Sequence, residues 1–125
     1  MTNGTMTRID TVKTASGLNV VAGIWLILAP FILGYANLVP AFWNDVVVGI
    51  LLVVLAGIRV ANPNQYVGLS WTNLGLGIWL ILAPFILDYA VYATPMWNDI
   101  MVGIVAACLA VWSAVSTPSS RPLMR

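Results

Sequence analysis

The chain has 125 residues, enough for one domain, of which 61% are hydrophobic and 7% charged, with a mean hydropathy of +0.96. A soluble protein carries about 25% charged residues, so this composition excludes a water-soluble globule, and five scattered basic residues exclude a nucleic-acid interface. The chain has no histidine and one cysteine, which excludes histidine ligation of a metal or haem and any dithiol pair.

Two parts of the chain repeat one pattern. The segment GIWLILAPFIL at residues 23–33 recurs at 77–87, and Trp-Asn-Asp at 43–45 recurs at 97–99, always with an offset of 54 residues. Such self-similarity indicates one structural unit built twice. The predicted organisation is an N-terminal tail (1–15), repeat 1 (16–61), a linker (62–69), repeat 2 (70–116) and a C-terminal tail (117–125).

Each repeat contains two long apolar stretches. A bilayer core of about 30 Å requires roughly 20 helical residues, so we predict four transmembrane helices. They cover about residues 18–35, 46–60, 74–89 and 100–115. The first stretch is expected to be a true span and not a cleaved signal peptide, because its near-copy lies in the middle of the chain. Ser16 and Ser70 precede the first helix of each repeat and are predicted N-caps.

The first helix of each repeat carries a tryptophan and a proline. Trp25 and Trp79 are predicted near the bilayer midplane, where they either pack in the protein interior or line a cavity for a small molecule or lipid. Pro30 and Pro84 each remove a backbone donor and favour a kink. The kinks either shape a small bundle or form the broken helices of a transporter.

The triplet Trp-Asn-Asp is predicted to open the second helix of each repeat. Its members are Trp43, Asn44 and Asp45 in repeat 1 and Trp97, Asn98 and Asp99 in repeat 2. Tryptophan suits the membrane interface, and Asn or Asp suits an N-cap at the positive end of the helix dipole. The alternative is an external cation or ligand site. Further along, Gly49 and Gly103 begin stripes of small residues that allow helix backbones to approach closely.

The basic residues predict the orientation. They lie in the tails and at the start of the linker, as Arg8, Lys13, Arg59, Arg121 and Arg125. The hairpin loops 36–44 and 90–98 contain no Lys or Arg. By the positive-inside rule, both termini are cytoplasmic. The predicted fold is therefore an all-α membrane protein of the cell (inner) membrane. Its four helices form two parallel hairpin repeats, related by a pseudo-two-fold axis along the membrane normal.

The tandem pattern resembles a known family. Each repeat has a tryptophan and then a small residue, a proline and an aromatic residue in its first helix, followed by Trp-Asn before its second. This pattern resembles the SPW-repeat family of small bacterial integral membrane proteins, named for a Ser-Pro-Trp motif. Here the motif reads Ala29-Pro30-Phe31 and Ala83-Pro84-Phe85. The resemblance covers nearly the whole chain and implies a four-span repeat protein, without catalytic residues to transfer.

Two functions remain open from the sequence. The first is a non-enzymatic structural or accessory subunit that self-associates or joins a membrane complex, because no predicted span carries a charge well inside the membrane. The second is a small oligomeric transporter or channel with an acidic outer mouth. Its candidate residue is Asp88, which replaces Gly34 of repeat 1. No catalytic, cofactor or metal site is predicted, and the expected partners are the lipid bilayer and copies of this chain or other membrane subunits.

Overall fold

The protein forms a bundle of four long helices. The structure is a computed structural model and describes residues 8–62 and 66–116, which contain helices and no strand. The helices are α1 (Arg8–Ile32), α2 (Val39–Ala61), α3 (Val67–Ile86) and α4 (Ala93–Ser116). All four are long and apolar enough to cross a membrane. The predicted all-α membrane fold with four spans is therefore confirmed. The predicted C-terminal tail (117–125), residues 1–7 of the N-terminal tail and residues 63–65 of the linker lie outside the described residues. Residues 8–15 of the predicted N-terminal tail belong to α1, and residues 67–69 of the predicted linker belong to α3.

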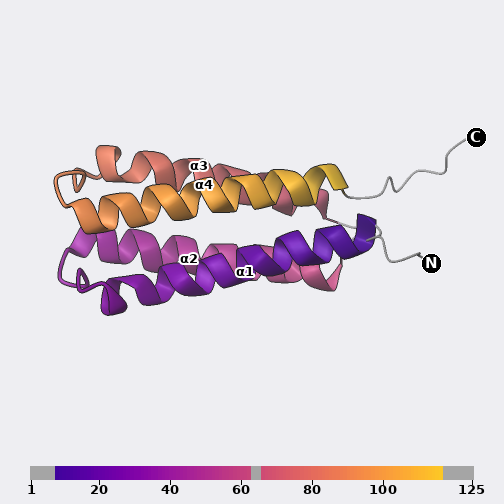
Figure 1. Ribbon diagram of the computed structural model, residues 1–125, viewed down its shortest axis with the longest axis horizontal. Coiled ribbons are helices and arrows are strands. Elements are labelled where there is room, and N and C mark those ends of the chain that lie inside the picture. The colour runs from indigo at the N-terminus through magenta and orange to yellow at the C-terminus, as the bar shows by residue number, and fades with distance from the viewer. Residues whose placement is uncertain (1–7, 63–65, 117–125) are drawn as a thin grey trace, which may run out of the picture.

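The helices pair as two hairpins. Figure 1 shows α1 beside α2 and α3 beside α4, with the two hairpin turns at one end of the bundle. We call this end the turn end, and we call the opposite end, where α2 stops and α3 starts, the linker end. Helix α1 also packs against α4, and α2 against α3, so α1 and α3 lie on one diagonal of the bundle. The membrane side of each end and the pseudo-two-fold axis stay predictions.

Glycines bring the two helices of each hairpin into backbone contact. A Cβ atom on Gly23 would lie 2.7 Å from the carbonyl oxygen of Gly49, and one on Gly77 would lie 2.8 Å from that of Gly103. Real Cβ atoms essentially never approach another heavy atom so closely. Only glycine permits this approach, which is how small residues bring helices together in lipid.

Each hairpin turn begins at a residue in the left-handed backbone conformation. Gly34 after α1 has φ = 84° and Asp88 after α3 has φ = 68°. The next backbone N–H folds back onto the helix, from Tyr35 to the Pro30 carbonyl and from Tyr89 to the Pro84 carbonyl, both at 2.9 Å. This is the Schellman arrangement, which satisfies carbonyls at a helix end. Both prolines lie in the last turn of their helices, and a kink at either stays a prediction.

A layer of apolar side chains fills the middle of the bundle. Leu26, Leu52 and Leu80 are fully buried at its centre. The other members of this apolar layer are Val48, Val102 and Ala106. The layer separates two groups of buried polar side chains, one toward each end of the bundle.

Candidate functional site

The Trp-Asn-Asp triplets lie inside their helices and not at the helix starts. Helix α2 begins at Val39, after the N-cap residue Leu38 and with Pro40 in its first turn. Asp45 therefore lies six residues into the helix, roughly 9 Å along its axis. Asp99 has the same place in α4, which begins at Ala93. The predicted N-cap role of the triplet in α2 is wrong, because the proline starts the helix earlier.

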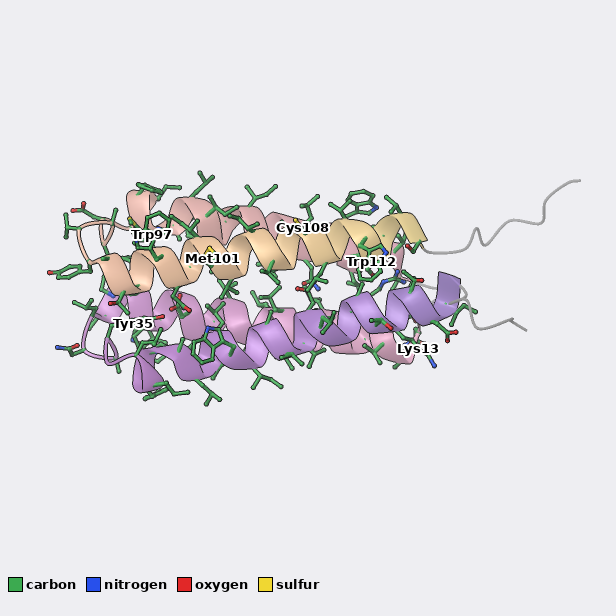
Figure 2. The ribbon with its side chains drawn as sticks, in the orientation of Figure 1. Lys13, Tyr35, Trp97, Met101, Cys108 and Trp112 are labelled. Atoms are coloured by element: carbon green, nitrogen blue, oxygen red, sulfur yellow. The ribbon has the colours of Figure 1, made fainter. Side chains whose placement is uncertain are left out.

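Both aspartates are fully buried in the bundle, and each accepts a hydrogen bond from a tyrosine of its own hairpin. Asp45 and Asp99 have 0% exposure. The hydroxyl of Tyr35 donates to Asp45 Oδ2, and the hydroxyl of Tyr89 donates to Asp99 Oδ2. The Schellman turns direct these tyrosines into the bundle, and Figure 2 shows Tyr35 at the turn end.

Asparagines connect each tyrosine to the other hairpin. Asn98 Nδ2 of α4 donates to the Tyr35 hydroxyl, and Asn44 Nδ2 of α2 donates to the Tyr89 hydroxyl, both at 2.9 Å. Each phenol oxygen therefore accepts one hydrogen bond from the opposite hairpin, and its own O–H donates one to a carboxylate of the same hairpin. Neither hairpin completes this arrangement alone.

The two tryptophans hold the asparagines in place. Trp25 Nε1 donates to Asn98 Oδ1 at 2.8 Å, and Trp79 Nε1 donates to Asn44 Oδ1 at 2.7 Å. These bonds orient each side-chain amide so that its NH2 group points to a tyrosine. We call these side chains the turn-end cluster: Trp25, Tyr35, Asn44, Asp45, Trp79, Tyr89, Asn98 and Asp99.

The two carboxyl groups interact with each other at the centre of this cluster. The Oδ1 atom of Asp45 and that of Asp99 are both buried and have no hydrogen-bond partner. An ionised carboxylate only accepts hydrogen bonds, so two of them side by side repel and leave these oxygens unsatisfied. One shared proton removes both problems, as in other pairs of neighbouring buried carboxyl groups.

The tyrosines stay protonated around this pair. Burial, reinforced by the neighbouring Asp45, raises the pKa of Tyr35 above its ordinary value. Burial and Asp99 raise the pKa of Tyr89 in the same way. Both hydroxyls are therefore donors to the carboxylates at neutral pH, and the pair Asp45–Asp99 is the part of the cluster suited to exchange a proton.

Trp25 also lines a groove on the side of the bundle. The groove runs between α1 and α4, has a volume of about 450 Å³, and contains Leu18, Trp25, Asn98 and Met101 among its lining residues. Met101 is labelled on α4 in Figure 2. Trp25 is 37% exposed and lines this groove, whereas Trp79 packs against the apolar layer; a small molecule or lipid bound beside Trp25 stays a prediction. The position of both tryptophans near the bilayer midplane stays a prediction.

A second polar group is buried toward the linker end. Arg59 Nε donates to Ser70 Oγ at 2.8 Å, and the hydroxyl of Ser113 lies 2.9 Å from those of both Ser16 and Ser70. We call Ser16, Arg59, Ser70 and Ser113 the linker-end cluster. Ser16 and Ser70 lie within α1 and α3, so their predicted N-cap role is wrong. They instead join diagonal helices through one hydroxyl of α4.

Arg59 corrects a second expectation. Its charge is predicted at the start of the linker, but α2 extends to Ala61 and Arg59 is 0% exposed. Arg59, Asp45 and Asp99 are thus ionisable groups buried within the bundle, and the statement that no span carries a charge well inside the membrane, which concerns depth in the bilayer, stays a prediction. Arg59 also breaks the repeat, since its equivalent in repeat 2 is Ser113. The spacing was a usable signal, because residues 45, 52 and 59 are seven apart and share one helix face.

Asp88 is not part of either cluster. It is exposed in the turn after α3, whereas Asp99 is buried within the turn-end cluster. Its left-handed backbone conformation matches that of Gly34, so Asp88 begins the second hairpin turn as Gly34 begins the first. Trp43 and Trp97 are each 57% exposed, and their role at the membrane interface stays a prediction. Within residues 8–62 and 66–116, no three metal-ligating side chains lie together.

The fold and the two buried clusters define a multi-pass, all-α membrane protein with polar groups inside its bundle. A comparison with protein families matches residues 13–113 to the SPW repeat domain. The chain therefore belongs to the SPW-repeat family, although alanine and phenylalanine flank the proline where the family motif has serine and tryptophan. No curated protein and no solved structure matches the chain at a significant level.

Proposed function

We propose that this chain is a non-enzymatic membrane protein that binds a proton at the pair Asp45–Asp99 and transports it across the membrane. The observation that carries the proposal is the burial of both carboxyl groups in one cluster, where they interact with each other and each has one oxygen that lacks a hydrogen-bond partner. Ionisable groups inside a membrane bundle are costly, and they mark proton and ion pathways. Amides alone would complete a purely structural network without this cost.

The surrounding side chains support proton exchange at a fixed geometry. The tyrosine hydroxyls occupy the Oδ2 atoms, so the shared proton has the two Oδ1 atoms as its site. The asparagines and tryptophans bond to each other and to the tyrosines. Loss or gain of the proton therefore changes the charge of the pair while its scaffold stays in place.

Proton transport is a form of the second function that the sequence leaves open, a small transporter. Its acidic site is the buried pair Asp45–Asp99 and not the exposed Asp88. The accessory-subunit hypothesis rests on the lack of charge well inside the membrane, and the ionisable side chains of Asp45, Asp99 and Arg59, buried within the bundle, weigh against it. Self-association and a larger membrane complex stay predictions. A discrete hetero-complex isolated in nanodiscs, with no proton flux from the purified chain, would favour the accessory role.

Proton flux into liposomes tests the proposal. The full chain is reconstituted with a pH-sensitive dye inside the vesicles, and a potassium gradient with valinomycin drives proton entry. We expect flux above that of empty vesicles, reduced at least tenfold by Asp45→Asn and by Asp99→Asn. Asp88→Asn is the matched control and should match the unaltered chain, because Asp88 is exposed outside the cluster. Equal flux in all three variants would refute the proposal.

We also propose an orientation in the inner membrane with both termini in the cytoplasm. It is supported by Lys13 near the linker end (Figure 2) and by hairpin loops without Lys or Arg. Fluorescent-protein and alkaline-phosphatase fusions at the C-terminus test it. Fluorescence without phosphatase activity is expected, and the reverse result would place the turn end in the cytoplasm.

A further inference from the structure

Two more buried oxygens lack a partner, on the other side of the apolar layer. Asn19 and Asn73 are 1% and 2% exposed, and the Oδ1 atom of each has no hydrogen-bond partner. They hold equivalent positions on the diagonal helices α1 and α3. Each lies three residues after a serine of the linker-end cluster, so it is one helical turn deeper in the bundle.

The orientation of the Asn19 amide follows from its surroundings. Its Nδ2 group donates to the carbonyl oxygen of Ala106 on α4 at 3.3 Å. Exchanging the nitrogen and oxygen of the amide would bring two acceptors together, so the oxygen must face away from that carbonyl. A buried amide oxygen without a donor has lost its bonds to solvent without replacement, which is unfavourable, and such groups in proteins are commonly satisfied by internal water.

We infer that the Oδ1 atoms of Asn19 and Asn73 accept hydrogen bonds from buried water between the linker-end cluster and the apolar layer. Water is the ligand that fits, because each of these acceptor oxygens needs a donor and water supplies one. A metal cation is disfavoured since the guanidinium of Arg59 bonds to Ser70, one turn from Asn73. No carboxylate is among the residues of the linker-end cluster to offset a second positive charge.

This water forms the part of the proposed proton path that lies toward the linker end, a role that rests on the proposed function. From Asn19 to Leu26 and from Leu52 to Asp45 the helices each advance by seven residues, roughly 10 Å. The apolar layer is then the one dry segment between the buried water and the carboxyl pair. A proton that enters from the linker end travels through the serines and this water before it meets Leu26, Leu52 and Leu80.

Water-edited solid-state NMR of the full chain in nanodiscs tests the water itself. Magnetisation from water should reach the side-chain amides of Asn19 and Asn73 as fast as it reaches exposed amides, and at least several times faster than it reaches the Leu26 amide. Transfer to both asparagines as slow as to Leu26 would overturn the inference. This measurement does not depend on any transport activity.

Proton flux tests the role of the water. In the double variant Asn19→Leu/Asn73→Leu, side chains of similar size remove both acceptors, and flux should fall at least tenfold. Thr72→Leu, an exposed position next to Asn73, is the control and should keep its flux. If Asp45→Asn abolishes flux and the folded double variant retains it, the water is off the path while the proton site stands. If Asp45→Asn has no effect, the proposed function itself fails.

Discussion

The hydroxyl of Tyr35 donates a hydrogen bond to the buried carboxylate of Asp45, ten residues further along the chain. It also accepts one from Asn98 of the other hairpin at 2.9 Å. Tyr35→Phe keeps the ring and leaves both partners unsatisfied, so we expect a loss of about 1–3 kcal/mol in unfolding free energy. Tyr92→Phe changes an exposed hydroxyl and should stay within about 0.5 kcal/mol. Denaturation in detergent micelles, followed by circular dichroism, measures both, and equal stabilities would contradict the assigned bonds.

Stability should fall at alkaline pH because of the two buried tyrosines. Burial raises the pKa of Tyr35 and of Tyr89 in the folded state, whereas an unfolded tyrosine loses its proton near pH 10. The unfolded chain therefore binds fewer protons above about pH 10, and the unfolding free energy decreases as pH rises there. The double variant Tyr35→Phe/Tyr89→Phe should show a shallower decrease. A pH dependence as steep as that of the unaltered chain would show that these phenols are not the cause.

Backbone contact within a hairpin predicts a sharp difference between two neighbouring glycines. A Cβ on Gly77 would lie 2.8 Å from the Gly103 carbonyl oxygen, whereas one on Gly75 would meet nothing within 4 Å. Gly77→Ala should therefore destabilise the protein by about 1–3 kcal/mol through overpacking. Gly75→Ala should be neutral or stabilise by up to about 1 kcal/mol, since alanine favours a helix. Equal thermal stabilities of the two variants would argue against the close packing of α3 and α4.

The left-handed turn residue predicts a stabilising substitution. Asp88 has φ = 68°, where the equivalent Gly34 has φ = 84°. Because an L-residue in this conformation costs about 1 kcal/mol more than glycine, Asp88→Gly should raise the unfolding free energy by up to that amount. Gly34→Asp should lower it by a similar amount and serves as the reciprocal test. Proton flux should stay unchanged in Asp88→Gly, and a large loss of flux would return Asp88 to the transport mechanism.

Several features follow from the sequence because they are local or repeated. Hydrophobic stretches long enough to span a bilayer predict helices whatever their packing. The described helices contain the second and fourth stretches whole and most of the first and third, which run three residues into the hairpin turns. The repetition at a constant offset predicts two equivalent hairpins, and the proline-centred motif with Trp-Asn indicates the family. Glycine at positions 49 and 103 indicates close helix packing, which the contacts with Gly23 and Gly77 show.

The turn-end cluster is built by contacts between segments that lie far apart in the sequence. Asn and Asp near a helix start are compatible with both a cap and a buried pair, so residue type alone favours the simpler role. The inward direction of Asp45 follows from where Pro40 starts α2 and from which face meets the other hairpin. The bonds from Asn98 to Tyr35 and from Trp79 to Asn44 join residues far apart in the sequence.

The sequence by itself thus determines a duplicated, four-span helical membrane protein of the SPW-repeat family, since hydrophobic length and repetition act along the chain. The tertiary structure alone decides that Asp45 and Asp99 meet, that Arg59 is buried, and that Trp25 and Trp79 hold the asparagines of the opposite hairpins. These relationships require two helix faces to be brought together. The helix register and the glycine contacts set that packing, and no single segment encodes it.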